Sequence, residues 1–193
     1  RLVKGTGSTV MDVGCGSGDK LVRHVAPRAG RTIGVDQPSG IALAQERFAG
    51  PEWVAVDLAE PASWDQLGTM APDLVLCSDV VEHLEDPYEL LVRLRDLAGP
   101  SGRVVVSTPD RERLRTTTAA GPPHNPRHVR EWSASEFRLL LESAGLQVLA
   151  TRHFLPRKYS LTRTDVNLVG YRLLHGRPVP DDRSSMAFLV APA

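Results

Sequence analysis

One nine-residue stretch near the amino terminus constrains the fold more than any other part of the chain. It reads Val-Met-Asp-Val-Gly-Cys-Gly-Ser-Gly over residues 10–18. An apolar run typical of a buried strand runs there into three glycines, Gly14, Gly16 and Gly18, each two residues apart. Glycine lets the backbone turn sharply and approach a ligand where a Cβ would clash. A helix start expected at Asp19 adds unpaired backbone N–H donors. The stretch therefore predicts a strand–loop–helix unit that binds a nucleotide-like ligand.

Strands and helices alternate along the rest of the chain. We expect strands at residues 9–13, 32–35, 53–56, 73–78, 104–107, 146–150 and 186–190. We expect helices at residues 19–25, 41–48, 63–67, 88–97, 134–144 and 166–174. Most of the strands are continuous Val, Ile and Leu runs, which is typical of a parallel sheet covered on both faces. The expected fold class is α/β: a doubly wound, Rossmann-like, mostly parallel sheet of seven strands with an antiparallel last strand.

Local signals mark several helix ends. Pro27 is expected to stop the first helix. Ser133 and Glu136 have the spacing of a capping box, in which each side chain satisfies the other's backbone donor. Gly145 then supplies the left-handed residue that ends this helix.

The chain of 193 residues is expected to form one domain, residues 1–193, large enough to bury a core. It opens only a few residues before the first strand, so either the domain is naturally minimal or an N-terminal lid segment is missing. Its two cysteines, Cys15 and Cys77, show neither zinc nor disulfide spacing, which fits a reducing cytoplasm. No secretory signal or membrane-length apolar run is visible. We expect a cytoplasmic protein without a membrane partner.

Four residues suited to ligand contacts fall at the carboxyl ends of predicted parallel strands. They are Gly14, Asp36, Asp57 and Ser78. Ligands of doubly wound sheets bind at this edge. The pattern places one binding site there.

The glycine spacing decides between two kinds of nucleotide site. In the dinucleotide fingerprint G-x-G-x-x-G the third glycine would come one residue later, which disfavours a nicotinamide-dependent oxidoreductase. The spacing D-x-G-x-G-x-G from Asp12 to Gly18 instead resembles motif I of class I S-adenosylmethionine (SAM)-dependent methyltransferases. The resemblance extends over nearly the whole chain and includes the segments 73–83 and 102–109.

The resemblance implies SAM as the cofactor and S-adenosylhomocysteine as its product. Asp36 stands where the family's second-strand acid pairs with both ribose hydroxyls, a task that suits a carboxylate because it accepts two O–H donors at once. Asp57 and Leu58 match residues that meet the adenine. The implied cofactor-binding residues are Asp12, Gly14, Gly16, Gly18, Asp36, Gln37, Asp57, Leu58 and Ser78. Cys15 is expected to be a small filler, since nothing in the sequence marks it as activated.

Two routes could deprotonate the methyl acceptor. In the first, a histidine acts as general base: His83 lies just beyond the fourth strand, and His124 and His128 lie in the long loop that follows the fifth. The alternative role for His83 is local packing or capping.

The second route uses a metal ion. Asp79-x-x-Glu82-His83 resembles the Glu-x-x-Glu-His segment of the ubiquinone-pathway and small-RNA 2′-O-methyltransferases, and the sequence after His128 resembles the H-x-x-E-W context of the RNA enzymes. This resemblance implies Mg or Mn held by Asp79, Glu82, His83 and His128. Asp79 is one methylene shorter than the family's glutamate. The alternative is that Glu82 caps the next helix.

The charge distribution bears on the acceptor. Lys plus Arg equals Asp plus Glu over the whole chain, but residues 103–163 hold eleven bases and five acids. A basic rim there favours an anionic acceptor: a carboxylate, a phosphorylated or nucleotide-linked sugar, or RNA. In overall pattern the chain resembles the small bacterial-type methyltransferases of glycan and natural-product pathways, and this resemblance implies a small polar acceptor such as a sugar or natural product. We expect an enzyme that methylates oxygen, or in second place nitrogen, of such a small molecule. RNA is a weaker candidate partner because few aromatics are available for base stacking. The alternatives are a metal-assisted RNA ribose 2′-O-methyltransferase and a non-catalytic SAM-binding module of a larger protein.

Overall fold

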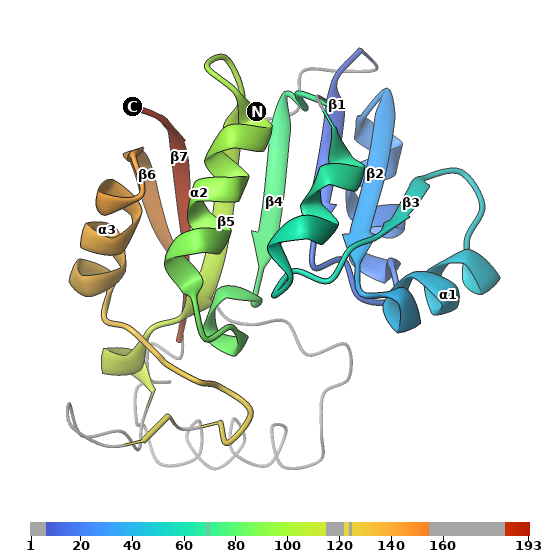
Figure 1. Ribbon diagram of the computed structural model, residues 1–193. Coiled ribbons are helices and arrows are strands. Elements are labelled where there is room, and N and C mark those ends of the chain that lie inside the picture. Colours follow the sequence, from blue (N-terminus) through green and yellow to red (C-terminus); the bar gives the residue numbers. More distant parts are fainter. Residues whose placement is uncertain (1–6, 69, 115–121, 124, 155–183) are drawn as a thin grey trace, which may run out of the picture.

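A seven-stranded sheet forms the centre of the computed structural model, which describes residues 7–68, 70–114, 122–123, 125–154 and 184–193 (Figure 1). The strands lie in the order β3-β2-β1-β4-β5-β7-β6. They span β1 Thr9–Val13, β2 Arg31–Asp36, β3 Glu52–Ala55, β4 Leu74–Ser78, β5 Arg103–Pro109, β6 Leu146–Phe154 and β7 Ser185–Pro192. Strands β1 to β5 pair in parallel, and β7 runs antiparallel to both β5 and β6. The predicted α/β class and the antiparallel last strand are confirmed.

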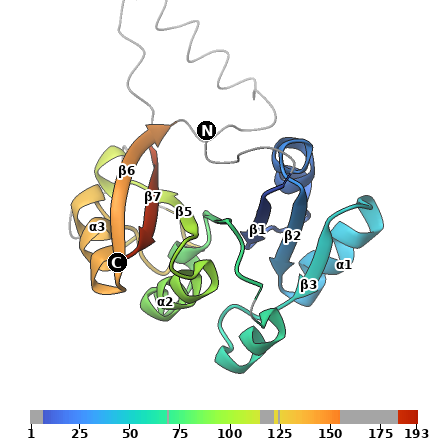
Figure 2. The same ribbon diagram turned by 90° about the horizontal axis from the view of Figure 1, so that it is seen from above.

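Helices cover both faces of this sheet. The three α-helices are α1 Pro38–Arg47, α2 Pro87–Ala98 and α3 Ala134–Ser143. Shorter helical segments span Leu21–Val25, Ala26–Arg28, Pro61–Leu67, Val81–His83 and Arg111–Arg113. Seen from above, α2 and α3 lie on one face and the segment after β1 lies on the other (Figure 2). The doubly wound arrangement follows from this placement.

The core explains why these segments become strands and helices. The middle strands β1, β2 and β4 are almost entirely buried, so their Val, Ile and Leu runs are covered from both sides. Leu90, Leu91 and Leu94 recur at helical spacing on α2 and pack into the same core. Ala98 is also buried, and Leu97 is partly buried against the same core.

Several predicted boundaries are wrong by a few residues. Helical backbone continues past Pro27 to Arg28, because a proline in the first turn of a 3₁₀ helix loses no hydrogen bond. Helix α1 begins at Pro38 for the same reason, and Phe48 ends it instead of joining its buried face. Strand β6 extends to Phe154 because it pairs along β7 with a register shift at residues 148–150. The helix predicted at 166–174 lies outside the described residues.

The predicted capping box at the start of α3 is confirmed. The Ser133 hydroxyl accepts from the backbone N–H of Glu136 at 3.3 Å, and the Glu136 carboxylate accepts from the N–H of Ser133 at 2.8 Å. Gly145 follows the helix with a φ of +76°.

A segment between β5 and α3, yellow in Figure 1, runs along the edge where the parallel strands end. We call residues 125–132 the strap. The backbone N–H of Val129 donates to the carbonyl of Glu82 at 2.8 Å. The carbonyl of Trp132 accepts from the N–H of Arg111 at 2.9 Å. The strap is thereby attached to the segments that follow both β4 and β5.

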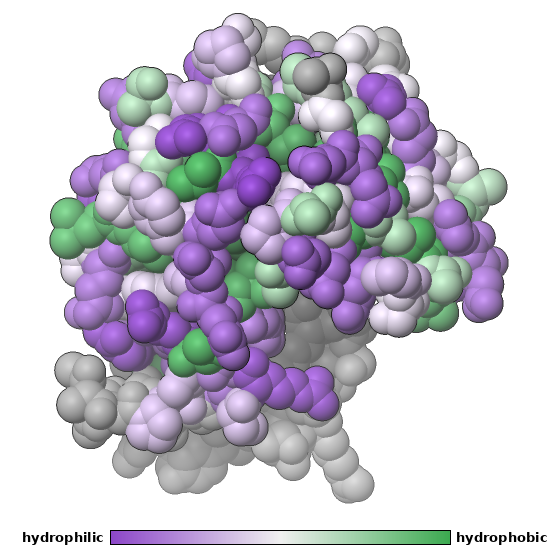
Figure 3. Space-filling model, in the orientation of Figure 1, coloured by the Kyte–Doolittle hydropathy of each residue, from purple (hydrophilic) through white to green (hydrophobic). Residues whose placement is uncertain are grey.

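The exposed face in Figure 3 is mixed in character, with apolar side chains scattered among polar ones. Exposed large apolar residues such as Leu43 and Leu139 are ordinary for a protein surface. Among the described residues, none of the helices is long and apolar enough to span a membrane.

Candidate functional site

The glycine stretch forms a loop attached to the neighbouring strand. The backbone N–H groups of Gly14 and Cys15 both donate to the carbonyl of Val35, at 2.8 and 3.1 Å. The N–H of Gly16 donates to the Asp36 carboxylate at 2.7 Å. The loop and the acid at the end of β2 therefore form one rigid unit, as their positions in the sequence predict.

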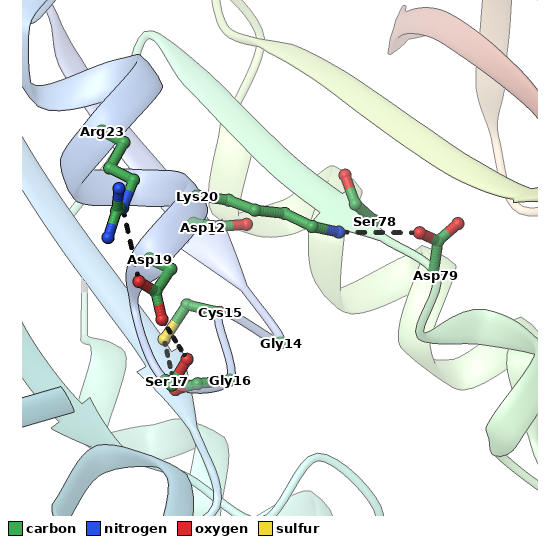
Figure 4. A pocket seen from close by; sticks show the side chains of 10 residues that line it. All are labelled: Asp12, Gly14, Cys15, Gly16, Ser17, Asp19, Lys20, Arg23, Ser78 and Asp79. Atoms are coloured by element: carbon green, nitrogen blue, oxygen red, sulfur yellow. Dashed lines mark hydrogen bonds and ion pairs between the residues drawn. The ribbon is translucent and has the colours of Figure 1, made fainter. Parts of the chain in front are cut away.

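A cavity of about 700 Å³ opens beside this loop, between the ends of β1 and β4 (Figure 4). Its lining is formed by Asp12, Gly14, Cys15, Gly16, Ser17, Asp19, Lys20, Arg23, Ser78 and Asp79. Four of the predicted cofactor-binding residues are in this set: Asp12, Gly14, Gly16 and Ser78. Ser17, Asp19, Lys20 and Arg23 were not predicted, although they follow the glycines directly in the sequence.

The other predicted cofactor-binding residues, Gly18, Asp36, Gln37, Asp57 and Leu58, do not line this cavity. Gln37 donates its backbone N–H to the Asp36 carboxylate at 2.9 Å and precedes α1 at the N-cap position, without a side-chain cap. Asp57 accepts from the N–H of Ala59 at 3.0 Å. Leu58 lines a second cavity of about 430 Å³, which His83 and Trp64 also line. Gly18 lies against the ring of Trp53.

Asp36 retains capacity to accept further hydrogen bonds. Its Oδ2 accepts from Gly16 and its Oδ1 from Gln37. A carboxylate has about four lone-pair sites, so about two remain for a ligand. The backbone donors fix the direction in which those sites point.

Burial changes the acid–base behaviour of two groups at the loop. Asp12 is 7% exposed, and burial together with the nearby Asp36 charge raises its pKa to about 6, against a lowering effect of Lys20. Burial and the charges of Asp12 and Asp36 raise the pKa of the Cys15 thiol. The thiol is therefore protonated near neutral pH, which agrees with the prediction that Cys15 is a filler.

Three of the four predicted metal-ligating residues come together. Glu82, His83 and His128 each offer a ligand atom within 4.8 Å of the others. The fourth, Asp79, lies apart from this group: its carboxylate faces Lys20 at 3.6 Å and lines the large cavity. Asp79 has a left-handed backbone, with a φ of +58°, between the end of β4 and the segment Val81–His83.

Hydrogen bonds orient both histidines. His83 Nδ1 lies 3.0 Å from the Arg127 carbonyl, and because a carbonyl only accepts, this nitrogen is the donor; in the neutral imidazole the lone pair is then on Nε2. His128 Nδ1 lies 2.6 Å from the Glu131 carboxylate, and its Nε2 lies 3.0 Å from the Asn125 amide nitrogen. The two rings meet edge to face at 4.9 Å. His124 lies outside the described residues.

Glu82 is buried beside these histidines. It is 1% exposed, and it accepts from the Thr108 hydroxyl at 3.1 Å. Burial is the main cause that raises its pKa to about 7, and the charges of Asp79 and Glu131 add to it. The role of local helix cap, the alternative for Glu82, falls to Asp86, which accepts from the N–H of Glu89 at the start of α2.

Some arginines of the expected basic rim form ion pairs with acids of the same chain. Arg111 pairs with Glu136 at 2.7 Å, and Arg113 lies 3.5 Å from Asp110. Arg127 and Arg130, on the strap, are exposed. Arg115, Arg157 and Lys158 lie outside the described residues. Of the described arginines, those on the strap remain the candidates for contact with an anionic acceptor.

Comparison with known proteins gives a consistent set of relatives. A family model described as a methyltransferase domain matches residues 1–151. The ubiquinone biosynthesis O-methyltransferase of Acinetobacter baylyi is 33% identical over 111 residues, 54% of this chain and 45% of the relative. The tRNA U34 carboxymethyltransferase of Shewanella putrefaciens is 36% identical over 105 residues, 52% of this chain and 31% of the relative. The chain thus spans half or less of the length of these curated relatives.

A solved structure agrees with them on the fold. A SAM-dependent methyltransferase from Clostridium acetobutylicum superposes with a TM-score of 0.66 at 12% sequence identity, covering 96% of this chain and 84% of the other. At this identity the superposition speaks to the fold alone.

Proposed function

The chain belongs to the methyltransferase-domain family, and from this premise we propose that it transfers the methyl group of SAM to an oxygen of a small polar or anionic acceptor. Nitrogen is the second choice of acceptor atom. A sugar or a natural product with free hydroxyls fits this description. The observation that carries the proposal is the Asp36 carboxylate, which is tied to the glycine loop and keeps acceptor sites for two ribose hydroxyls.

The donor half of the site is supported by the cavity beside the glycine loop. Asp12, Gly14, Gly16 and Ser78 line it, and Asp36 borders it through Gly16. Gln37, Asp57 and Leu58 follow the ends of β2 and β3, next to Asp36 in the sheet. We assign the ribose to Asp36 and the adenine to the side of Asp57 and Leu58.

Methyl transfer from SAM mainly requires that the protein align the acceptor with the methyl group. The sulfonium of SAM is already a good leaving group, so the acceptor oxygen must be held in line behind the methyl carbon. Proximity and orientation can supply roughly 7–11 kcal/mol of the barrier. The acceptor hydroxyl must also lose its proton.

His83 is the better placed of the two predicted bases. Its Nδ1–H donates to the Arg127 carbonyl, so the Nε2 lone pair can accept the proton of a hydroxyl. His128 has both ring nitrogens engaged, by Glu131 and Asn125. We therefore assign the proton transfer to His83 and a supporting role to His128.

A metal-assisted reaction is the second candidate, and the approach of Glu82, His83 and His128 within 4.8 Å favours it. The donor set of one carboxylate and two imidazoles suits a divalent ion. His83 Nδ1 is held by Arg127 and His128 Nδ1 by Glu131, and His128 Nε2 would exchange its Asn125 contact for the ion. A bound Mg or Mn would supply Lewis acidity to the acceptor hydroxyl. With an RNA ribose as acceptor, this would be 2′-O-methylation.

Ligand binding tests the proposal first. Calorimetry with the intact chain is expected to show binding of both SAM and S-adenosylhomocysteine, and Asp36→Ala is expected to weaken both because it removes the ribose acceptor. Glu46→Ala, an exposed acid on α1, is the matched control and should bind as the parent does. Absence of binding by the parent chain would reject the donor assignment.

Turnover separates the acceptor classes. Transfer of radiolabelled methyl groups should be measured across hydroxylated metabolites, amines and an RNA oligonucleotide. Labelling of the small hydroxylated compounds is the expected result, and labelling of RNA alone would favour the second candidate. SAM binding without label in any class would favour a non-catalytic SAM-binding module.

A further inference from the structure

One turn of the strap contacts both imidazoles of the candidate metal group. The N–H of His128 donates to the Asn125 carbonyl at 2.9 Å, which closes the turn over residues 125–128. The Asn125 side-chain oxygen accepts from the Arg127 N–H at 3.0 Å. Asparagine followed by proline favours such a turn, because proline fixes φ at the second position. The turn contacts His83 through the Arg127 carbonyl and His128 through the Asn125 amide. Four consecutive residues therefore set the surroundings of both rings.

The Asn125 side chain has a defined orientation. Its Oδ1 accepts from the Arg127 N–H, so its Nδ2 is the atom that lies 3.0 Å from His128 Nε2. An amide nitrogen only donates, and His128 Nε2 is therefore the acceptor. His128 Nδ1 lies 2.6 Å from the carboxylate of Glu131, whose side chain is 1% exposed, and Nδ1 donates there. The lone pair of the His128 imidazole is thus on Nε2, where Asn125 engages it.

An ion would need the same lone pair. A neutral imidazole has one lone pair in the ring plane, and a metal ion and a hydrogen-bond donor cannot use it together. Asn125 and an ion therefore exclude each other at His128. His83 differs, because Nδ1 donates to the Arg127 carbonyl and no hydrogen bond from the described residues engages Nε2. The competition is confined to one of the two imidazoles.

We propose that Asn125 sets the ion affinity of the group formed by Glu82, His83 and His128, because its amide occupies the His128 lone pair until an ion displaces it. Displacement breaks one hydrogen bond of ordinary net strength, which corresponds to about a 2- to 10-fold loss of ion affinity. Asn125 is a positioning residue for His128 and not a ligand. This inference rests on the metal-assisted candidate of the proposed function and adds a residue that the metal-binding motif does not contain.

Asn125→Ser tests the competition. A serine hydroxyl still accepts from the Arg127 N–H, as in an ST turn, and it lacks the amide that reaches His128. Mn²⁺ titrations of the intact chain, followed by electron paramagnetic resonance, are expected to show about 2- to 10-fold tighter binding by this variant than by the parent. Val129→Ser, an exposed and uncharged change next to the turn, is the matched control and should bind Mn²⁺ as the parent does. A cooperative urea transition verifies that each variant is folded.

A second comparison shows whether the effect passes through His128. In the His128→Ala background, Asn125→Ser should bring no gain in Mn²⁺ affinity, because the lone pair for which Asn125 competes is absent. A merely structural role of Asn125 would change the affinity by the same factor in both backgrounds.

The outcomes separate this inference from the function on which it rests. If Asn125→Ser binds Mn²⁺ no more tightly than the parent, or if the gain persists with His128→Ala, the inference is overturned. If neither the parent nor Asn125→Ser binds Mn²⁺, the inference and the metal-assisted candidate both fail, while binding of S-adenosylhomocysteine by the same chain keeps the donor assignment. If the parent does not bind S-adenosylhomocysteine, the donor assignment fails, and the Mn²⁺ titrations still decide the role of Asn125.

Discussion

Gly16, Gly18 and Gly34, of which the last two lie against the Trp53 ring, provide a test of how the loop is built. A Cβ at Gly16, with φ +55°, would meet nothing within 4 Å. A Cβ at Gly34 would overlap Cζ3 of the Trp53 ring, at a position without a left-handed backbone. A Cβ at Gly18 combines both problems, with φ +76° and an overlap with Cη2 of the same ring. Alanine at these positions separates backbone strain from steric overlap.

The expected magnitudes follow from these two causes. A left-handed alanine costs roughly 1–2 kcal/mol, so Gly16→Ala should lower the free energy of unfolding by about that amount. Overpacking costs typically about 1–3 kcal/mol, which is the expectation for Gly34→Ala. Gly18→Ala carries both and should cost about 2–5 kcal/mol. The loss of unfolded-state entropy that alanine brings, about 0.4–1 kcal/mol, is common to all three variants and cancels in the comparison.

Urea unfolding at constant pH measures these values in the absence of ligand. Repeating each variant with Trp53→Leu removes the ring that the new Cβ would meet. Gly34→Ala and Gly18→Ala should then cost about 1–3 kcal/mol less than in the parent background. Gly16→Ala should cost the same in both backgrounds, because its Cβ does not approach the ring. If Gly34→Ala costs the same with and without the indole, steric overlap with Trp53 is refuted as the cause.

Three further predictions concern charge, capping and metal. Burial raises the pKa of Asp12 from 3.8 to about 6, so the folded state binds this proton more tightly than the unfolded state does. The protonated carboxyl therefore adds to the free energy of unfolding. This contribution is complete below pH about 4 and is lost as the pH rises through about 6. Asp12→Asn should therefore remove on the order of 3 kcal/mol of that pH dependence, measured by urea unfolding between pH 4 and 7, and an unchanged profile would contradict the assignment. Ser133→Ala should lower the free energy of unfolding by about 1 kcal/mol through loss of the cap, whereas exposed Ser101→Ala should change it by less than about 0.5 kcal/mol. If a metal assists the reaction, EDTA should abolish methyl transfer and Mn²⁺ should restore it; turnover that is insensitive to EDTA, with an active His128→Ala, would exclude the metal-assisted candidate.

The positions of the candidate residues at the strand ends were largely predictable from the sequence. The strands are short apolar runs, and the residues at their ends follow directly in the chain, so the order of the residues alone assigns Gly14, Asp36 and Ser78 to one edge of the sheet. The capping box at Ser133 is equally local, because its two partners are three residues apart. The boundary errors at Pro27 and in β6 arose where a proline or a neighbouring strand changed a local preference.

The surroundings of His83 and His128 were not predictable in the same way, because their contacts join distant segments. The sequence indicates His83 and His128 individually, but their orientation depends on Arg127, Glu131 and Asn125. The motif places Asp79 in the metal group, and in the structure its carboxylate faces Lys20. The charge count places Arg111 in a basic rim, and Glu136 on α3 pairs with it.

By itself the sequence determined the fold class, the glycine loop and the acids that border it, because hydrophobic periodicity, caps and turn residues act over a few neighbouring positions. Only the tertiary structure decided the strand order, the approach of Lys20 to Asp79, and the meeting of Glu82, His83 and His128. These side-chain contacts join residues up to 59 positions apart, Lys20 and Asp79, and the paired strands join residues up to 86 positions apart, Val104 and Val190. Packing of the sheet and its loops brings such residues together, and no local pattern in the sequence indicates which charged residues will pair.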